Sequence, residues 1–186
     1  VPAAVLFPQQ GIFGELRIFK EHLAEMMVPH DVQDGPDRNP RQLGVHQENA
    51  EPFVLDTSAI LALWNNEDGA STVEKVIREA SPLKPVYLSF MTFMECRYRV
   101  WKDLGRDAAD ELFRSLSLLP VTRVDVDDSL IMAASELKAQ YKISTADSWI
   151  IATAITRNAT LMHKDPEFAA LSDRVTLKTL PYKKAE

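Results

Sequence analysis

The sequence has little cysteine and no long apolar run, and each shortage excludes a class of protein. Cys96 is the only cysteine among 186 residues, so no internal disulfide can form, which is typical of a reducing compartment. No apolar run reaches the roughly 18 residues of a membrane-spanning helix. The first residues also lack the charged start and apolar centre of a secretion signal. The sequence therefore predicts a soluble, cytoplasmic protein that does not enter a membrane.

Positive charge is also in short supply. The formal net charge is −6, which argues against binding nucleic acid or an anionic membrane through the whole surface but leaves room for a local basic patch. Hydrophobic residues make up 46% of the chain and charged residues 26%. These proportions are ordinary for a globular domain with a sizeable core.

Residues 1–52 differ in composition from the rest of the chain. They hold six of the eleven prolines, and residues 30–52 have almost no apolar side chain, which is typical of an arm or linker. Residues 12–27 alone carry apolar side chains at helical spacing, which predicts one amphipathic helix. The segment has three interpretations: a genuine arm, an over-extended reading frame or a remnant of cloning. Residues 53–186 form the predicted functional domain.

From Phe53 onward, short runs rich in β-branched residues alternate with helical patterns. This alternation predicts an α/β fold with three layers, in which a mostly parallel central sheet lies between helices. The expected strands are 53–56, 86–89, 120–124, 160–164 and 175–180. The expected helices are 58–66, 71–80, 91–103, 106–118, 127–141, 146–158 and a short one after Asp165.

Four carboxylates fall where the predicted strands end or the following helices begin. Asp56 closes the first strand, Glu95 lies about one turn into the helix after the second, and Asp147 opens the helix TADSWIIATA. Asp165 directly follows the run TLMHK. Ligands of open α/β sheets bind outside the carboxyl ends of the strands, so the four acids are all placed to reach one edge.

Each acid also has a purely structural interpretation. Asp165 precedes Pro166, as a helix N-cap often does. Asp147 follows Ser144 by three residues, the spacing of a capping box. Glu95 has an arginine four residues later, so an ion pair on the helix surface is an alternative.

Asp56 is harder to explain as a structural residue. It interrupts the apolar run FVLDTSAILALW, and Thr57 or Ser58 is expected to be the better-placed cap for the helix that follows. An unpaired charge in a dry environment costs several kcal/mol, so Asp56 is expected to face a cleft.

Convergence of the four acids at neutral pH would require protonation or a cation. Two like charges about 4 Å apart repel by about 4 kcal/mol at an effective dielectric near 20. Oxygen ligands without histidine or cysteine suit Mg²⁺ or Mn²⁺ rather than zinc. Because magnesium sites are often completed by substrate phosphates, the expected partner is a phosphoester.

The segments VLDTSAIL, MECRYR, TADSWIIATA and LMHKDPEF, in this order, resemble the PIN domain family, and most closely its VapC-type toxins. The resemblance runs from about Phe53 to Tyr182 and implies an Mg²⁺- or Mn²⁺-dependent endoribonuclease on an α/β/α domain. The implied metal ligands are Asp56, Glu95, Asp147 and Asp165.

The resemblance implies further details of the site. A hydroxyl after the first acid maps to Thr57 or Ser58, and Thr145 is a possible further polar contributor. The sequence departs from the family at His163 and Lys164, where many relatives carry Thr-Arg. Attack by a metal-bound water would leave a 5′-phosphate and a 3′-hydroxyl.

The resemblance also implies partners: an RNA substrate, a second copy of the chain in a homodimer, and an antitoxin protein whose C-terminal segment enters the site. The predicted helix 12–27, with Arg17 and Lys20, is a candidate for acting as such a segment in cis.

A basic strip follows Glu95 along the predicted helix 91–103 and just beyond it. Tyr98 and Trp101 interleave with its cations, a pattern that suits RNA phosphates and bases. The alternative is that both aromatic rings face the core and the charges are merely solvated. The candidate RNA-binding residues are Arg97, Arg99, Lys102 and Arg106.

Two other functions compete with cleavage of RNA. A phosphotransfer domain would phosphorylate Asp56, but the dehalogenase pattern requires a second aspartate two residues later, where Ser58 stands. The other alternative is a PIN-like scaffold that binds RNA or protein without cutting.

Overall fold

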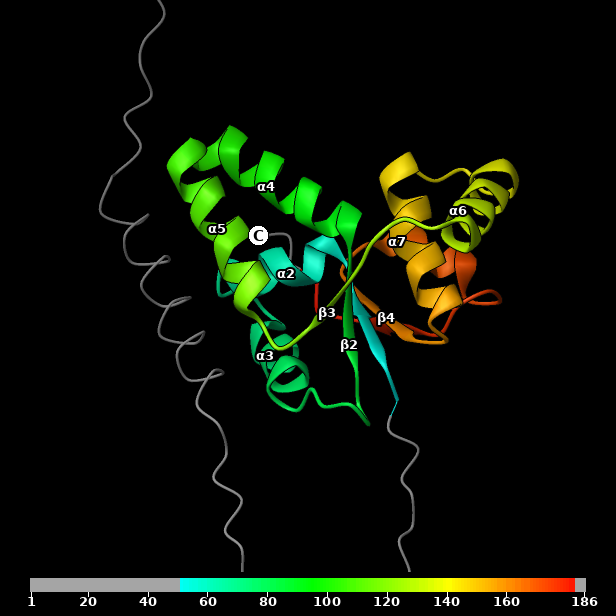
Figure 1. The fold of residues 1–186 in the computed structure, drawn as a ribbon, viewed down its shortest axis with the longest axis horizontal. Coiled ribbons are helices and arrows are strands. Elements are labelled where there is room, and N and C mark those ends of the chain that lie inside the picture. Colours follow the sequence, from blue (N-terminus) through cyan, green and yellow to red (C-terminus); the bar gives the residue numbers. More distant parts are fainter. Residues whose placement is uncertain (1–50, 183–186) are drawn as a thin grey trace, which may run out of the picture.

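The computed structural model describes residues 51–182, and its centre is a five-stranded parallel sheet (Figure 1). The strand order is β3-β2-β1-β4-β5, and all four neighbouring pairs are parallel. The predicted arm and its helix 12–27 lie outside the described residues. The strands are β1 (Phe53–Leu55), β2 (Val86–Ser89), β3 (Thr122–Val124), β4 (Thr160–His163) and β5 (Leu177–Thr179).

Helices cover both faces of the sheet, which confirms the predicted α/β/α architecture (Figure 1). Helices α2 (Thr57–Trp64), α3 (Ala70–Arg78), α4 (Phe90–Leu104) and α5 (Arg106–Leu118) pack on one face. Helices α6 (Asp128–Gln140) and α7 (Thr145–Thr156) and the 3₁₀ helix η1 (Pro166–Leu171) pack on the other.

The core is split by the sheet because side chains alternate along each strand. In β1, Leu55 packs with α2 to α5, whereas its neighbour Val54 packs with α6 and α7. In β4, Met162 and Leu161 divide in the same way. These central strands are therefore apolar on both faces, as expected of a parallel sheet enclosed by helices.

The direction in which successive strands are added to the sheet reverses between β1 and β4. The chain moves from β1 outward to β2 and β3, and then returns so that β4 pairs with the free side of β1, with Phe53 opposite Thr160. The backbone N–H of Asp56 continues this ladder by donating to the Met162 carbonyl over 3.0 Å. Open α/β sheets bind ligands at such a reversal, outside the carboxyl ends of the strands.

None of the helices within residues 51–182 combines the length and the apolarity that crossing a membrane requires.

Candidate functional site

Asp56 lies at the carboxyl end of β1, and its side chain is buried. The residue is the N-cap of α2: its carboxylate accepts hydrogen bonds from the Ser58 backbone N–H, over 2.9 Å, and from the Ser58 hydroxyl. The expectation that Thr57 or Ser58 caps this helix is therefore wrong. β1 ends at Leu55, so Asp56 takes the extended backbone conformation of a cap, and the next two residues belong to the helix.

Ser58 connects Asp56 to the end of β4. Its hydroxyl oxygen accepts a hydrogen bond from the backbone N–H of Lys164 over 2.9 Å while donating to the Asp56 carboxylate. The two central strands are thus joined at their carboxyl ends by one side chain. This contact limits the orientations open to Asp56.

Glu95 approaches the same edge from α4. The Thr57 hydroxyl donates to the Glu95 carboxylate over 2.7 Å, so the first residue of α2 holds an acid from another helix. The hydroxyls of Thr57 and Ser58 thus each contact one of the predicted acids. The sequence had left open which of the two hydroxyls would do so.

The charge of Asp147 acts on both Asp56 and Glu95. Burial raises the pKa of Asp56, the hydrogen bonds from Ser58 and Thr57 oppose this rise, and the Asp147 charge adds to it. Burial likewise raises the pKa of Glu95: Thr57 opposes the rise, Asp56 and Asp147 add to it, and the nearby Arg99 lowers the pKa. Three of the predicted acids therefore repel one another across one site.

Asp147 and Asp165 also have the structural roles considered from the sequence. Asp147 completes a capping box with Ser144 at the start of α7, with hydrogen bonds of 3.0 and 3.1 Å. Asp165 is the N-cap of η1 and accepts from the Glu167 N–H over 2.8 Å, with Pro166 at the first helical position. Both side chains are half-buried. A cap uses only part of a carboxylate's acceptor capacity, so oxygen lone pairs remain.

The carboxylate oxygens of the site suit Mg²⁺ or Mn²⁺, but the side chains are not arranged as a closed metal cage. Among residues 51–182, no group of three or more His, Cys, Asp or Glu side chains has the spacing of a metal cage. Mg²⁺ is usually held by one or two carboxylates, with waters and substrate phosphates completing its shell. The buried Asp56, whose charge interacts with those of Asp147 and Glu95, fits that kind of open site.

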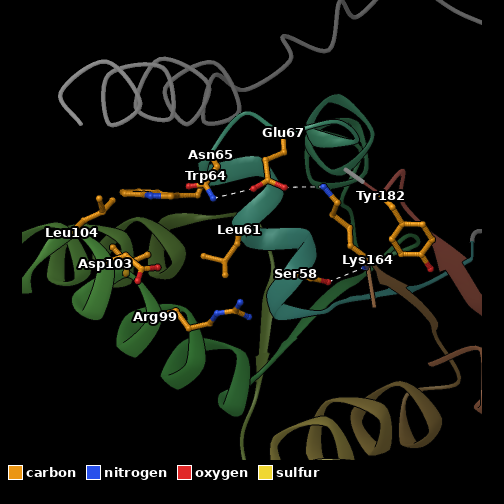
Figure 2. Close-up of a pocket in the computed structure, with 11 residues that line it drawn as sticks. Ser58, Leu61, Trp64, Asn65, Glu67, Arg99, Asp103, Leu104, Lys164 and Tyr182 are labelled. Carbon is orange, nitrogen blue, oxygen red and sulfur yellow. Dashed lines mark hydrogen bonds and ion pairs between the residues drawn. The ribbon is translucent and has the colours of Figure 1, made fainter. Parts of the chain in front are cut away.

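A pocket of about 620 Å³ is lined mainly by residues of α2 and α4 (Figure 2). Ser58 belongs to both the pocket and the acidic site, and Arg99 points into the pocket from α4. The remaining lining residues are Leu61, Trp64, Asn65, Glu67, Val100, Asp103, Leu104, Lys164 and Tyr182.

An ion pair closes one side of this pocket. The Lys164 ammonium contacts the Glu67 carboxylate at 2.8 Å and the Asp68 carbonyl at 3.2 Å. The Lys164 side chain is only 10% exposed and that of Glu67 20%. The sequence analysis missed this pair, because 97 positions separate the two residues and no local pattern connects them.

The four candidate RNA-binding cations differ in their surroundings. Arg97 is held by the Asp110 carboxylate through hydrogen bonds of 3.0 and 2.6 Å, and Arg106 approaches the same carboxylate at 3.6 Å. Arg99 and Lys102 are exposed.

The two aromatic side chains of the basic strip, Tyr98 and Trp101, are exposed by 49% and 44%. The interpretation that they face the core is therefore wrong.

His163 is a packing residue at the end of β4. Its ring is buried, lies 5.1 Å from the ring of Phe168 and places Nε2 3.3 Å from the Thr179 hydroxyl. Burial lowers its pKa, which favours the neutral form.

The comparison with known families matches residues 53–173 to the PIN domain. This match covers more than half of the chain and begins at the strand that Asp56 terminates. The chain therefore belongs to the PIN domain family. Among curated protein sequences, no significant match was found.

Solved structures of the VapC type share this fold. VapBC2 from Rickettsia felis, solved with a DNA fragment from their promoter, has 18% identity and a TM-score of 0.57 over 70% of this chain and 99% of that one. VapC20 of Mycobacterium tuberculosis, a toxin that cleaves the sarcin–ricin loop, has 20% identity and a TM-score of 0.56 over 69% and 99%. DNA-bound VapBC from Salmonella typhimurium has 17% identity and a TM-score of 0.55 over 69% and 98%.

Proposed function

We propose that this PIN domain protein is a metal-dependent endoribonuclease and the toxin of a type II toxin–antitoxin pair. The observation that carries the proposal is the buried Asp56 carboxylate at the reversal of strand order, coupled electrostatically to Glu95 and Asp147. Three acids that repel one another at a ligand-binding edge are best accommodated when a cation joins them, and a substrate phosphate can complete the shell of such a cation. One structural relative is described as a toxin that cleaves an RNA loop, which agrees with this chemistry.

The proposal gives each side chain a role. Asp56, Glu95 and Asp147 would hold Mg²⁺ or Mn²⁺, and Asp165 would join them directly or through a water. When bound, such an ion would lower the pKa of a water, so that a hydroxide nucleophile is available at neutral pH, and would offset negative charge on the phosphate. Hydrolysis of the phosphodiester would leave a 5′-phosphate and a 3′-hydroxyl.

The two hydroxyls would orient the acids rather than take part in bond breaking. Ser58 fixes one oxygen of Asp56, and Thr57 fixes one oxygen of Glu95. Such hydrogen bonds reduce the number of carboxylate rotamers that must be restricted when the ion binds. We assign both residues this positioning role.

The proposal also includes partners and a compartment. Several structural relatives are VapBC complexes, which supports a protein antitoxin as a partner of this chain. We further propose that the protein forms a homodimer in the cytoplasm, where its RNA substrate is found.

Cleavage of a structured RNA pool by the purified full chain tests the proposal. Reactions would contain Mg²⁺, Mn²⁺ or EDTA, and Asp56→Asn would be compared with the wild type. Asp173→Asn is the matched control, because Asp173 is an exposed aspartate outside the acidic group. We expect cleavage with either ion, none in EDTA, at least a 100-fold loss in Asp56→Asn and no change in the control.

Cleavage that persists in both EDTA and Asp56→Asn would assign the activity to a contaminant. Binding of RNA without cleavage, under conditions where the wild type also binds Mn²⁺, would favour the scaffold alternative. The 5′ ends of the products, tested by ligation, check the proposed direction of hydrolysis.

A further inference from the structure

Lys164 contacts helix α2 at its beginning and the turn that follows its end. The backbone N–H of Lys164 donates to the Ser58 hydroxyl over 2.9 Å, in the first turn of the helix. Its ammonium contacts the Glu67 carboxylate at 2.8 Å and the Asp68 carbonyl at 3.2 Å, just beyond the carboxyl end of the helix. Figure 2 shows the contacts of Lys164 with Ser58 and Glu67. One residue at the end of β4 therefore fixes α2 in two places.

The side-chain contact joins two ordered segments. The Lys164 side chain is 10% exposed and that of Glu67 20%. The backbone at Glu67 is itself fixed, because its N–H donates to the Ala62 carbonyl over 2.8 Å and its carbonyl accepts from the Ala70 N–H over 2.9 Å. A buried ammonium that lost its carboxylate would be left without its charge partner. The pair therefore restrains where Lys164 can lie.

Ser58 transmits the position of Lys164 to Asp56. A hydroxyl has one proton to donate and lone pairs that accept. The Ser58 oxygen accepts from the Lys164 N–H, and its proton is donated to the Asp56 carboxylate. The Ser58 backbone N–H donates to the same carboxylate oxygen, Oδ2, over 2.9 Å. The place of the Lys164 backbone thus sets the direction of the hydroxyl and, through it, the orientation of the acid.

Lys164 acts on this acid by position rather than by charge. Burial raises the pKa of Asp56, and the hydrogen bonds from Ser58 are the largest opposing effect. The Lys164 ammonium is paired with Glu67, so its charge is already engaged. The contact through Ser58 is therefore the route by which Lys164 affects Asp56.

Resting on the proposed function, we propose that Lys164 is a positioning residue that aims the Ser58 hydroxyl at Asp56 and thereby sets the affinity of the site for Mg²⁺ or Mn²⁺. The Glu67 contact holds Lys164 in place for this role. A carboxylate that is already oriented loses less rotamer freedom when an ion binds. Groups that orient metal ligands typically change metal affinity or activity about 10- to 100-fold when they are removed.

Mn²⁺ binding by the full chain without RNA tests this inference, with free Mn²⁺ followed by its electron paramagnetic resonance signal. The variants are Lys164→Met, Ser58→Ala and the two combined, with Lys164→Arg as the conservative variant. Gly105→Ala is the control for lost stability. Gly105 has positive φ, so alanine is strained there, but an added Cβ would have no neighbour within 4 Å.

We expect Lys164→Met to weaken Mn²⁺ binding about 10- to 100-fold, with Lys164→Arg and Gly105→Ala close to the wild type. Ser58→Ala should cause a loss of similar size. Adding Lys164→Met to Ser58→Ala should change the affinity less than about twofold, because the route through the hydroxyl is then already absent.

Kinetics separate positioning from direct contact with the substrate. At saturating Mn²⁺, the KM of Lys164→Met for RNA should stay within about twofold of the wild type, because a positioning residue does not touch the RNA. A lysine that bound a phosphate would instead raise KM and weaken the dependence of RNA binding on salt when replaced.

Glu67→Gln repeats the test with a smaller change, in case Lys164→Met does not fold. It keeps the shape of the side chain and the whole of Lys164, and removes only the charge that holds the ammonium. Mn²⁺ binding should weaken in the same direction as in Lys164→Met.

Unchanged Mn²⁺ affinity in Lys164→Met and Glu67→Gln would overturn the inference while leaving the proposed function standing. Losses that add in the combined Ser58 and Lys164 variant would also overturn it, because Lys164 would then act by another route. A raised KM with unchanged Mn²⁺ affinity would make Lys164 a phosphate ligand instead. If the wild type bound no Mn²⁺ and cut no RNA, the proposed function itself would fail, and the inference with it.

Discussion

Replacement of Lys164 by methionine tests whether the ion pair at the pocket holds the end of β4 in place. The Lys164 ammonium contacts Glu67 at 2.8 Å, and the side chains are 10% and 20% exposed. Methionine preserves most of the aliphatic length but leaves the Glu67 carboxylate and the Asp68 carbonyl without this donor. The backbone N–H that binds Ser58 is retained.

The expected cost follows from the burial of the pair. Removing one partner of a fully buried pair costs about 3–5 kcal/mol, whereas exposed pairs contribute about 0.2–1 kcal/mol. A pair with these exposures lies between the two limits, at about 2 kcal/mol. For a domain of this size, about 2 kcal/mol lowers the Tm by roughly 4–8 °C.

Thermal and urea unfolding of Lys164→Met measure this cost, with Lys75→Met as the control. Lys75 pairs with Glu79 at 3.9 Å on α3, with side chains 73% and 51% exposed, so its loss should cost under about 0.5 kcal/mol. A double-mutant cycle with Glu67→Gln isolates the interaction between the two side chains. A coupling energy below about 0.5 kcal/mol would refute the reasoning, because the two charges would then contribute no more than an exposed pair.

Two further predictions concern stability at other positions. Burial raises the pKa of Asp56 above its ordinary value of 3.8, so the wild type loses this contribution to stability as the pH rises through the raised pKa. The stability of Asp56→Asn relative to the wild type, measured in EDTA by urea unfolding, should therefore be higher at pH 7 than at pH 4; an equal difference at both pH values would contradict this. Gly69 and Gly105 both have positive φ, but an added Cβ would come within 3.1 Å of a neighbouring side chain only at Gly69. Gly105 has open space around it, but its backbone, at φ 90° and ψ 172°, lies in a region essentially confined to glycine. Gly105→Ala should therefore lose about 1–3 kcal/mol from backbone strain alone, measured by thermal unfolding; an unchanged Tm would contradict this.

Local signals in the sequence predicted most of the elements and the structural roles of two acids. The capping box of Ser144 and Asp147, and the N-cap at Asp165 before proline, depend on residues within three positions of each other. Such patterns are readable because the interacting groups are neighbours in the chain. The five strands were located by the same kind of local evidence, namely short β-rich runs between helical patterns.

Contacts between distant residues were not predictable in this way. Lys164 and Glu67 are in contact although 97 positions separate them in the sequence, and Arg97 pairs with Asp110 on the next helix. The cap of α2 was misassigned because Asp56, Thr57 and Ser58 can all serve as caps, and only the end of β1 decides among them. Tertiary packing selects one partner from several that are chemically equivalent.

The roles of the candidate site residues remain predictions. The electrostatic coupling of Asp56, Glu95 and Asp147 places three of the four proposed ligands in one region, while Asp165 is defined here only as a helix cap.

The pairing of β1 with β4 has a consequence for folding during synthesis of the chain on the ribosome. The hydrogen bond from the Lys164 N–H to Ser58 joins residues 106 positions apart, so Asp56 acquires its final surroundings only after nearly the whole domain has been translated. At about 5–20 residues per second, the ribosome needs about 5–20 s to make that intervening chain. During this interval the nascent polypeptide lacks an assembled acidic site. A ribosome making a nuclease of the proposed kind would thus be shielded from its own product until Lys164 has been added and can reach Ser58.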